Sequence, residues 1–203
     1  MASIKERYTT AVRRGVAPVA ERLVNGRVTP NMLTVAGLAL TLAAAPFIIT
    51  GHTAVGAVIF LVGSLTDMLD GAVARLGKQV TAFGAFLDST SDRVAEGVIL
   101  GSIALLYARE DHIGRVALVF IVLIASFLVS YTRARAEALG LQCKVGLMAR
   151  PERVVLLVIG LLFARFFILD AVLIIMAVLT SWTVVTRILY VRKQLDSGVA
   201  PRS

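Results

Sequence analysis

Six apolar stretches, each close to the length of a bilayer crossing, constrain the fold of this chain more than any other feature. They cover roughly residues 31–50, 53–74, 83–107, 113–139, 151–168 and 170–192. About 20 apolar residues in a helix cross the hydrocarbon core of a bilayer, where a backbone exposed to lipid must satisfy its own hydrogen bonds. The connections between the stretches are short. We therefore predict an all-α integral membrane protein with six transmembrane helices and a single domain over residues 1–203.

The composition and the N-terminal segment agree with this prediction. The sequence is 58% hydrophobic with a mean hydropathy of +0.84, which is too apolar for a soluble domain of 203 residues. Residues 1–27 are basic and lack the apolar core of a cleavable signal. Within them, apolar residues recur at helical spacing over residues 3–24. We predict an amphipathic helix here that lies in the membrane interface on the cytoplasmic side.

The net charge of +8 is explained by membrane topology rather than by binding to nucleic acid. In the six-helix arrangement, all of the 21 lysines and arginines fall on one side of the membrane except Arg109, Arg115 and Arg165. Cytoplasmic connections of membrane proteins carry this excess of basic residues. We therefore place both termini on the cytoplasmic side of a cell membrane and expect membrane lipids, but no nucleic acid, as partners.

Four aspartates interrupt the second and third apolar stretches. Asp67 and Asp70 are three residues apart and Asp88 and Asp92 are four apart, so each pair shares one helix face. The short connection makes the two helices an antiparallel hairpin, in which both pairs meet just inside the cytoplasmic surface. Charges at membrane depth are costly and mark functional sites. Because carboxylates of one sign need cations between them, and hard oxygen ligands suit Mg²⁺, Mn²⁺ or Ca²⁺, we predict a divalent-metal centre.

Small residues accompany the acids. Gly71 and Ala74 lie beside Asp70, and Gly84 lies one turn before Asp88. Small residues allow close helix packing in membranes. The absence of large side chains also lets a ligand approach the helix backbone beside a metal. Asn31, at the start of the first stretch, is placed to reach such a ligand.

The complete string D-x-x-D-G-x-x-A-R-x8-G-x3-D-x3-D resembles the signature of the CDP-alcohol phosphotransferase (CDP-alcohol phosphatidyltransferase) family. It is formed here by Asp67, Asp70, Gly71, Ala74, Arg75, Gly84, Asp88 and Asp92. The resemblance implies an enzyme with six spans and cytoplasmic termini that displaces CMP from a CDP-linked lipid with an alcohol. It also implies a homodimer.

The resemblance assigns roles to these residues. It implies two Mg²⁺ ions, with Mn²⁺ as an alternative, at a centre formed by all four aspartates. Asp67, Asp70 and Asp88 bind the ion on the pyrophosphate, Asp67 and Asp88 share the second ion, and Asp92 is the general base. The implied CDP-lipid site consists of Asn31, Asp70, Gly71, Ala74, Arg75, Thr81, Gly84 and Asp88.

A second, basic region bears on the acceptor alcohol. It contains Arg133, Arg135, Arg150 and Arg187. The planar guanidinium of arginine binds phosphate through paired hydrogen bonds, so we expect the acceptor alcohol to carry a phosphate. The segments Ser130–Glu137 and Arg150–Arg153 look like the phosphatidylinositol-phosphate synthase subfamily, in which Arg133 is often replaced by lysine. That likeness implies inositol 1-phosphate as the acceptor and CDP-diacylglycerol as the donor.

Several alternatives remain open at the level of sequence. Glycerol 3-phosphate, serine or another alcohol is compatible with the same chemistry, and an archaeal ether lipid is a possible donor. A cation transporter would place its acids near mid-membrane and often shows repeated halves, which we do not find. A prenyltransferase would use differently spaced aspartates and generally more spans. Glu96 has no assigned role beyond a helix contact.

Overall fold

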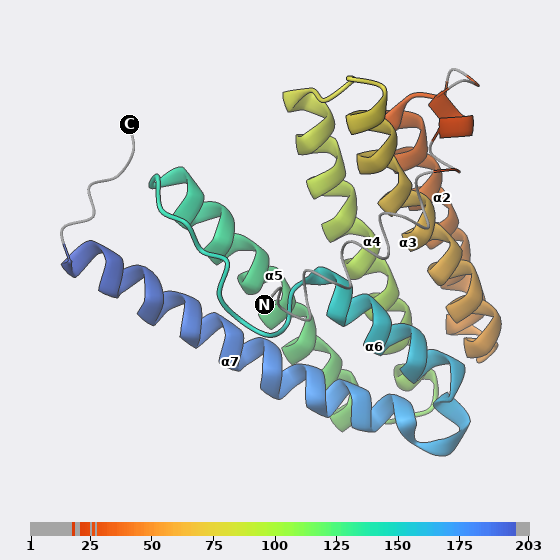
Figure 1. Cartoon of the computed structure of the whole chain (residues 1–203). Coiled ribbons are helices and arrows are strands. Elements are labelled where there is room, and N and C mark those ends of the chain that lie inside the picture. Colours follow the sequence, from red (N-terminus) through yellow and green to blue (C-terminus); the bar gives the residue numbers. More distant parts are fainter. Residues whose placement is uncertain (1–17, 19–20, 25, 27, 198–203) are drawn as a thin grey trace. The chain divides into compact units, whose positions relative to one another are not determined.

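The computed structural model describes residues 18, 21–24, 26 and 28–197, and within these residues it contains helices and no strands. Figure 1 shows the helices, which are α2 (Pro30–Ile49), α3 (Thr53–Leu76), α4 (Ala82–Arg109), α5 (Ile113–Ala138), α6 (Arg150–Leu162), the 3₁₀ helix η1 (Ala164–Phe166) and α7 (Ile168–Asp196). The prediction of an all-α chain is confirmed for this part of the sequence. Most of the amphipathic helix predicted over residues 3–24 lies outside the described residues.

Among the described helices, α2, α3, α5 and α7 are long and apolar enough to cross a membrane. Helix α4 has 28 residues, but Asp88, Asp92 and Arg93 lie in its N-terminal half and Glu96 lies at its middle. Helix α6 has only 13 residues. Four helices therefore meet this criterion where six crossings are predicted.

The fifth apolar stretch is not the continuous helix that we predict for residues 151–168. Helix α6 ends at Leu162, η1 follows, and Phe167 has a φ of 60° before α7 begins at Ile168. A residue in this left-handed region does not continue a right-handed helix. Arg165 is charged, but hydropathy does not place the break at Phe167, because Phe166 and Phe167 are as apolar as the helices on either side.

The described chain forms two compact units, each considered by itself. Unit 1 contains the described residues up to Ala43 together with Ile59–Ala95. Within it α2 and α3 approach at Gly37 and Gly63, where a Cβ added to either glycine would lie 2.8 Å from the carbonyl oxygen of the other. Such small residues let helix backbones pack closely in membranes. The added Cβ at Gly37 would also lie 3.1 Å from Cβ of Asp67, so this crossing places Asp67 against α2.

Unit 2 contains Ala44–Val58 and the described residues from Glu96 onward. Helix α7 packs against α5 and α6 within it (Figure 1). In the first turn of α7, Asp170 accepts a hydrogen bond of 2.6 Å from the Tyr107 hydroxyl and pairs with Arg115 at 3.0 Å. The guanidinium of Arg115 also lies 5.4 Å from the centre of the Tyr107 ring. This polar cluster joins α4, α5 and α7.

Candidate metal centre and substrate sites

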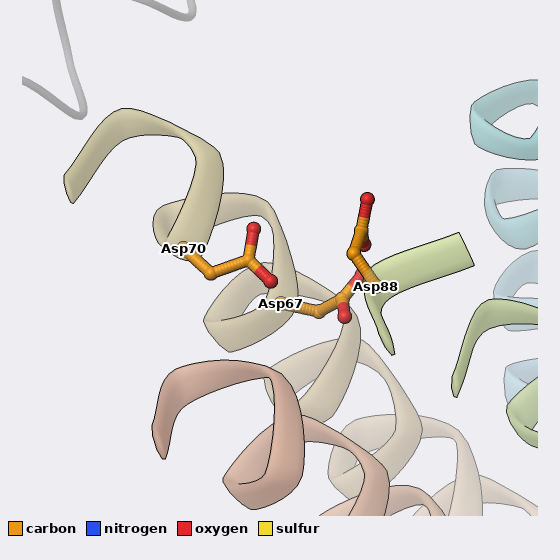
Figure 2. A group of neighbouring side chains, drawn as sticks. All are labelled: Asp67, Asp70 and Asp88. Carbon is orange, nitrogen blue, oxygen red and sulfur yellow. The ribbon is translucent and has the colours of Figure 1, made fainter. Parts of the chain in front are cut away.

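Asp67 and Asp70 of α3 and Asp88 of α4 form a compact carboxylate group. One oxygen from each lies within 4.8 Å of the others, and both residues of α3 are buried. Figure 2 shows the side chains of Asp67 and Asp70 extending from α3 toward Asp88. The spacing of three residues puts the α3 pair on one helix face, and the short turn before α4 brings Asp88 to that face.

The chemistry of this donor set fits a hard divalent cation. Three carboxylates this close, two of them buried, repel one another unless a positive charge lies between them. Carboxylate oxygens are the ligands preferred by Mg²⁺ and Mn²⁺, whereas zinc and copper sites usually include histidine or cysteine. The group of Asp67, Asp70 and Asp88 is therefore consistent with binding of a divalent metal ion.

Thr34 of α2 orients one of these carboxylates, although the sequence analysis does not identify it. Its buried hydroxyl donates to Oδ2 of Asp70 at 2.5 Å and also lies 3.2 Å from the carbonyl oxygen of Pro30. Groups that hydrogen-bond to a metal ligand fix its orientation and influence metal affinity. The only sequence signal is that Thr34 lies one helical turn after Asn31, a residue that we do predict for the site.

A cavity of about 320 Å³ in unit 1 opens beside the carboxylates. It lies within the range of roughly 300–1,000 Å³ typical of small-molecule sites. Its lining includes every residue predicted for the CDP-lipid site, namely Asn31, Asp70, Gly71, Ala74, Arg75, Thr81, Gly84 and Asp88. Pro30, Thr34, Gln79, Val80 and Ala85 complete the lining.

The small residues keep this cavity open. The Thr81 hydroxyl accepts a hydrogen bond of 2.9 Å from the Gly84 N–H and so caps the start of α4. A Cβ at Gly84 would lie 3.0 Å from Oγ1 of Thr81 and 3.2 Å from Oδ1 of Asn31. A Cβ at Gly71 would lie 3.2 Å from a guanidinium nitrogen of Arg75. Larger residues at these glycines would displace the polar groups that line the cavity.

Asp92 is not a member of the three-carboxylate group that the described residues form. It follows Asp88 by four residues on α4 and therefore shares its face. One oxygen is 3.9 Å from a guanidinium nitrogen of Arg93. Its position on the same face, one turn from the ligand group, suits a separate chemical role.

The predicted phosphate-binding arginines all belong to unit 2, but they differ in environment. Arg135 and Arg187 line one groove between α5 and α7. Arg133 is half exposed and pairs with Glu137 at 2.8 Å. Arg150 is half-buried and begins α6.

Arg187 is buried, and its guanidinium donates to backbone carbonyls. Nε donates to the oxygen of Val145 at 3.0 Å, and Nη1 donates to the oxygen of Val129. Arg187 therefore ties α7 to α5 and to the connection that precedes α6. Its positive charge is evident from the sequence, but these backbone contacts are not.

Comparison with known proteins gives a consistent result. Residues 27–187 match the CDP-alcohol phosphatidyltransferase family. The chain is 34% identical to the archaetidylinositol phosphate synthase of Methanothermobacter thermautotrophicus over 196 residues, which cover 95% of this chain and 96% of that protein. It is 40% identical to the phosphatidylinositol phosphate synthase of Corynebacterium glutamicum over 149 residues, which cover 72% and 68% of the two chains.

Solved structures are similar as well. The crystal structure of the Mycobacterium tuberculosis phosphatidylinositol phosphate synthase with CDP-DAG bound has a TM-score of 0.81 at 32% identity, and covers 88% of this chain and 94% of that one. The structure of the same enzyme in complex with manganese and citrate has a TM-score of 0.79, and covers 87% and 88%.

Proposed function

The chain belongs to the CDP-alcohol phosphatidyltransferase family, and we propose that it transfers a phosphatidyl group from CDP-diacylglycerol to a hydroxyl of inositol 1-phosphate. The membership confirms the resemblance of its aspartate motif and makes it a transferase of phospholipid biosynthesis with several membrane helices. The observation that carries the proposal is the carboxylate group of Asp67, Asp70 and Asp88 beside the cavity in unit 1. A polar, glycine-lined cavity beside a cation site suits a nucleotide pyrophosphate.

In this proposal Asp67, Asp70 and Asp88 bind two divalent ions, Mg²⁺ or Mn²⁺. When bound, these cations would neutralise the negative charge of the pyrophosphate. Arg75, whose guanidinium lies over Gly71 in the cavity wall, adds a fixed positive charge and hydrogen-bond donors for a phosphate oxygen. Thr34 keeps the Asp70 carboxylate in its binding orientation.

The chemical step uses Asp92 as the general base. The acceptor oxygen forms a bond to the phosphorus that carries the lipid, and the bond from that phosphorus to the CMP oxygen breaks. CMP keeps the electron pair, and the acceptor hydroxyl proton passes to Asp92. A carboxylate beside the metal ligands, but outside their group, can accept this proton.

The acceptor phosphate is bound in this proposal by Arg133, Arg135, Arg150 and Arg187. The relatives support inositol phosphate as the acceptor, because their names describe synthases of phosphatidylinositol phosphate and archaetidylinositol phosphate. Arg187 contributes mainly through its charge and through the backbone groups that it holds in place.

We also propose that the chain crosses the membrane six times, that α4 and α6 supply the two crossings beyond the four apolar helices, and that it acts as a homodimer. The 28 residues of α4 are long enough to cross a bilayer, and η1 follows α6 directly along the chain. The distribution of lysine and arginine supports cytoplasmic termini and a cytoplasmic active site.

The test is CMP release by the purified chain with CDP-diacylglycerol and Mg²⁺. The acceptor panel contains inositol 1-phosphate, free inositol, glycerol 3-phosphate and serine. We expect turnover with inositol 1-phosphate and its loss on chelation of the metal. Turnover with free inositol but not with its phosphate would refute the arginine assignment, and preference for glycerol 3-phosphate would reassign the acceptor.

A further inference from the structure

Glu96 of α4 and Arg153 of α6 form a buried, two-point ion pair in unit 2. Arg153 Nε donates to Oε1 of Glu96 at 2.5 Å, and Nη2 donates to Oε2 at 2.7 Å. The side chain of Arg153 is 2% exposed and that of Glu96 is 11% exposed. Paired hydrogen bonds between two planar groups fix their mutual orientation as well as their distance.

The remaining terminal nitrogen of Arg153 reaches the connection that precedes α6. Nη1 donates to the carbonyl oxygen of Met148 at 3.0 Å. The N–H of Met148 donates to Oγ1 of Thr183 on α7 at 3.4 Å. Both backbone polar groups of Met148 are therefore held, and Met148 lies two residues before Arg150, the first residue of α6.

Neighbouring residues of the same connection are equally constrained. Gly146 has a φ of +108°, and a Cβ on it would lie 2.3 Å from Cγ2 of Thr183. The carbonyl oxygen of Val145 accepts a hydrogen bond from Arg187. The backbone that leads into Arg150 is thus held by side chains from α6 and α7, and through Arg153 by Glu96 of α4.

The energetics of a buried ion pair favour a positional role over a stabilising one. Desolvation of two charges offsets much of their attraction, so well-packed apolar residues often stabilise a protein as well or better. The planar guanidinium of Arg153 contacts both a carboxylate and a backbone carbonyl, and so fixes their relative positions. A pair of apolar side chains would not fix them in this way.

We propose that Glu96 and Arg153 are positioning residues for the acceptor-phosphate site. Through the carbonyl of Met148 they set the start of α6 and with it the location of Arg150. The inference rests on the proposed function, in which Arg150 binds the acceptor phosphate. Loss of the pair shifts Arg150 without touching either substrate, so it weakens use of the acceptor and spares the CDP-lipid.

The experiment compares Glu96→Gln and Arg153→Lys with the wild-type full chain. We expect the KM for inositol 1-phosphate to rise about tenfold or more, because small displacements of a binding group have effects of this size, and the KM for CDP-diacylglycerol to stay within about twofold. Arg153→Lys keeps the positive charge but loses the guanidinium and its paired hydrogen bonds. If either single variant fails to fold, the double variant Glu96→Gln with Arg153→Gln leaves no unpaired buried charge and carries the same expectation.

Cys143 provides a readout independent of turnover. It is the only cysteine of the sequence and is buried in the same connection, five residues before Met148. We expect its alkylation to accelerate in the Glu96 and Arg153 variants. The matched control is Asp170→Asn, which weakens the ion pair with Arg115 in the first turn of α7. It should leave the acceptor KM and the alkylation rate unchanged.

The outcomes separate the two proposals. Failure of the wild-type chain to use any phosphorylated acceptor would refute the proposed function. If the wild type uses inositol 1-phosphate but the variants have an unchanged acceptor KM, or equal rises in both KM values, the positioning role is overturned and the proposed function stands. A selective rise in the acceptor KM together with faster alkylation of Cys143 supports the positioning role.

Discussion

The crossing of α2 and α3 offers a direct test of how packing places the aspartates of the candidate metal centre. In Gly37→Ala the new Cβ would lie 2.8 Å from the carbonyl oxygen of Gly63, and 3.1 Å and 3.2 Å from Cβ and N of Asp67. Ordinary van der Waals contact begins near 3.4 Å, so the two helices must separate by the difference between 3.4 and 2.8, roughly 0.6 Å. The atoms that it meets include helix backbone, which cannot rotate away as a long side chain does.

The matched control is Gly101→Ala on α4, because a Cβ there meets no atom within 4 Å outside its own stretch of helix among the described residues. Alanine favours a helix over glycine by about 1 kcal/mol at both positions, so this term cancels. Overpacking costs about 1–3 kcal/mol, which corresponds to roughly 2–12 °C in Tm for a chain of this size. We expect the Tm of Gly37→Ala in detergent to be lower than that of Gly101→Ala by this margin.

The same displacement moves Asp67, so metal binding provides a second measurement. A loss of about 1.4 kcal/mol would weaken Mn²⁺ binding about tenfold, which titration followed by electron paramagnetic resonance detects without turnover. The Gly101 variant should bind Mn²⁺ as the wild type does. Equal Tm values and equal Mn²⁺ affinities for the two variants would refute the claim that the Gly37–Gly63 contact places Asp67.

Three further predictions concern polar contacts. Thr34→Val should weaken Mn²⁺ binding about 10–100-fold by releasing the Asp70 carboxylate, whereas Thr34→Ser should retain it; equal binding by both would exclude an orienting role for the hydroxyl. Asp92→Asn should lower kcat about 10²–10⁴-fold while Mn²⁺ affinity is kept, and an unchanged rate would rule out Asp92 as the base. Tyr107→Phe should lower the free energy of unfolding by about 1.5–3 kcal/mol through loss of the hydrogen bond to Asp170, with both KM values unchanged, and a chain of wild-type stability would contradict this estimate.

Local features of the site follow from the sequence because they depend on helix geometry within one hairpin. The spacings of Asp67 to Asp70 and of Asp88 to Asp92 place each pair on one face, and the short turn between α3 and α4 brings the faces together. The cavity lining follows the same logic, since most of it comes from these two helices. Pro30, Asn31 and Thr34 of α2 also line the cavity, and of these only Asn31 is predicted for the site, from its position at the helix start.

Other features require the tertiary structure because they join residues far apart in the chain. Thr34 reaches Asp70 across 36 positions, and Arg153 reaches Glu96 across 57. No helical spacing relates such pairs. The end of α6 at Leu162 likewise escapes an analysis of hydropathy, since the left-handed Phe167 lies within an apolar run.

The sequence by itself determined that this is a helical membrane chain, because helical periodicity is a local property, and its aspartate motif carried the resemblance to the CDP-alcohol phosphatidyltransferase family. Only the tertiary structure decided which side chains hold the functional groups in place. Arg187 shows the difference: its charge is evident in the sequence, but packing alone directs its guanidinium to the backbone carbonyls of Val145 and Val129. Buried hydrogen-bond donors are almost always paired with an acceptor. Tertiary packing determines which segment provides that acceptor, and no local pattern in the sequence predicts it.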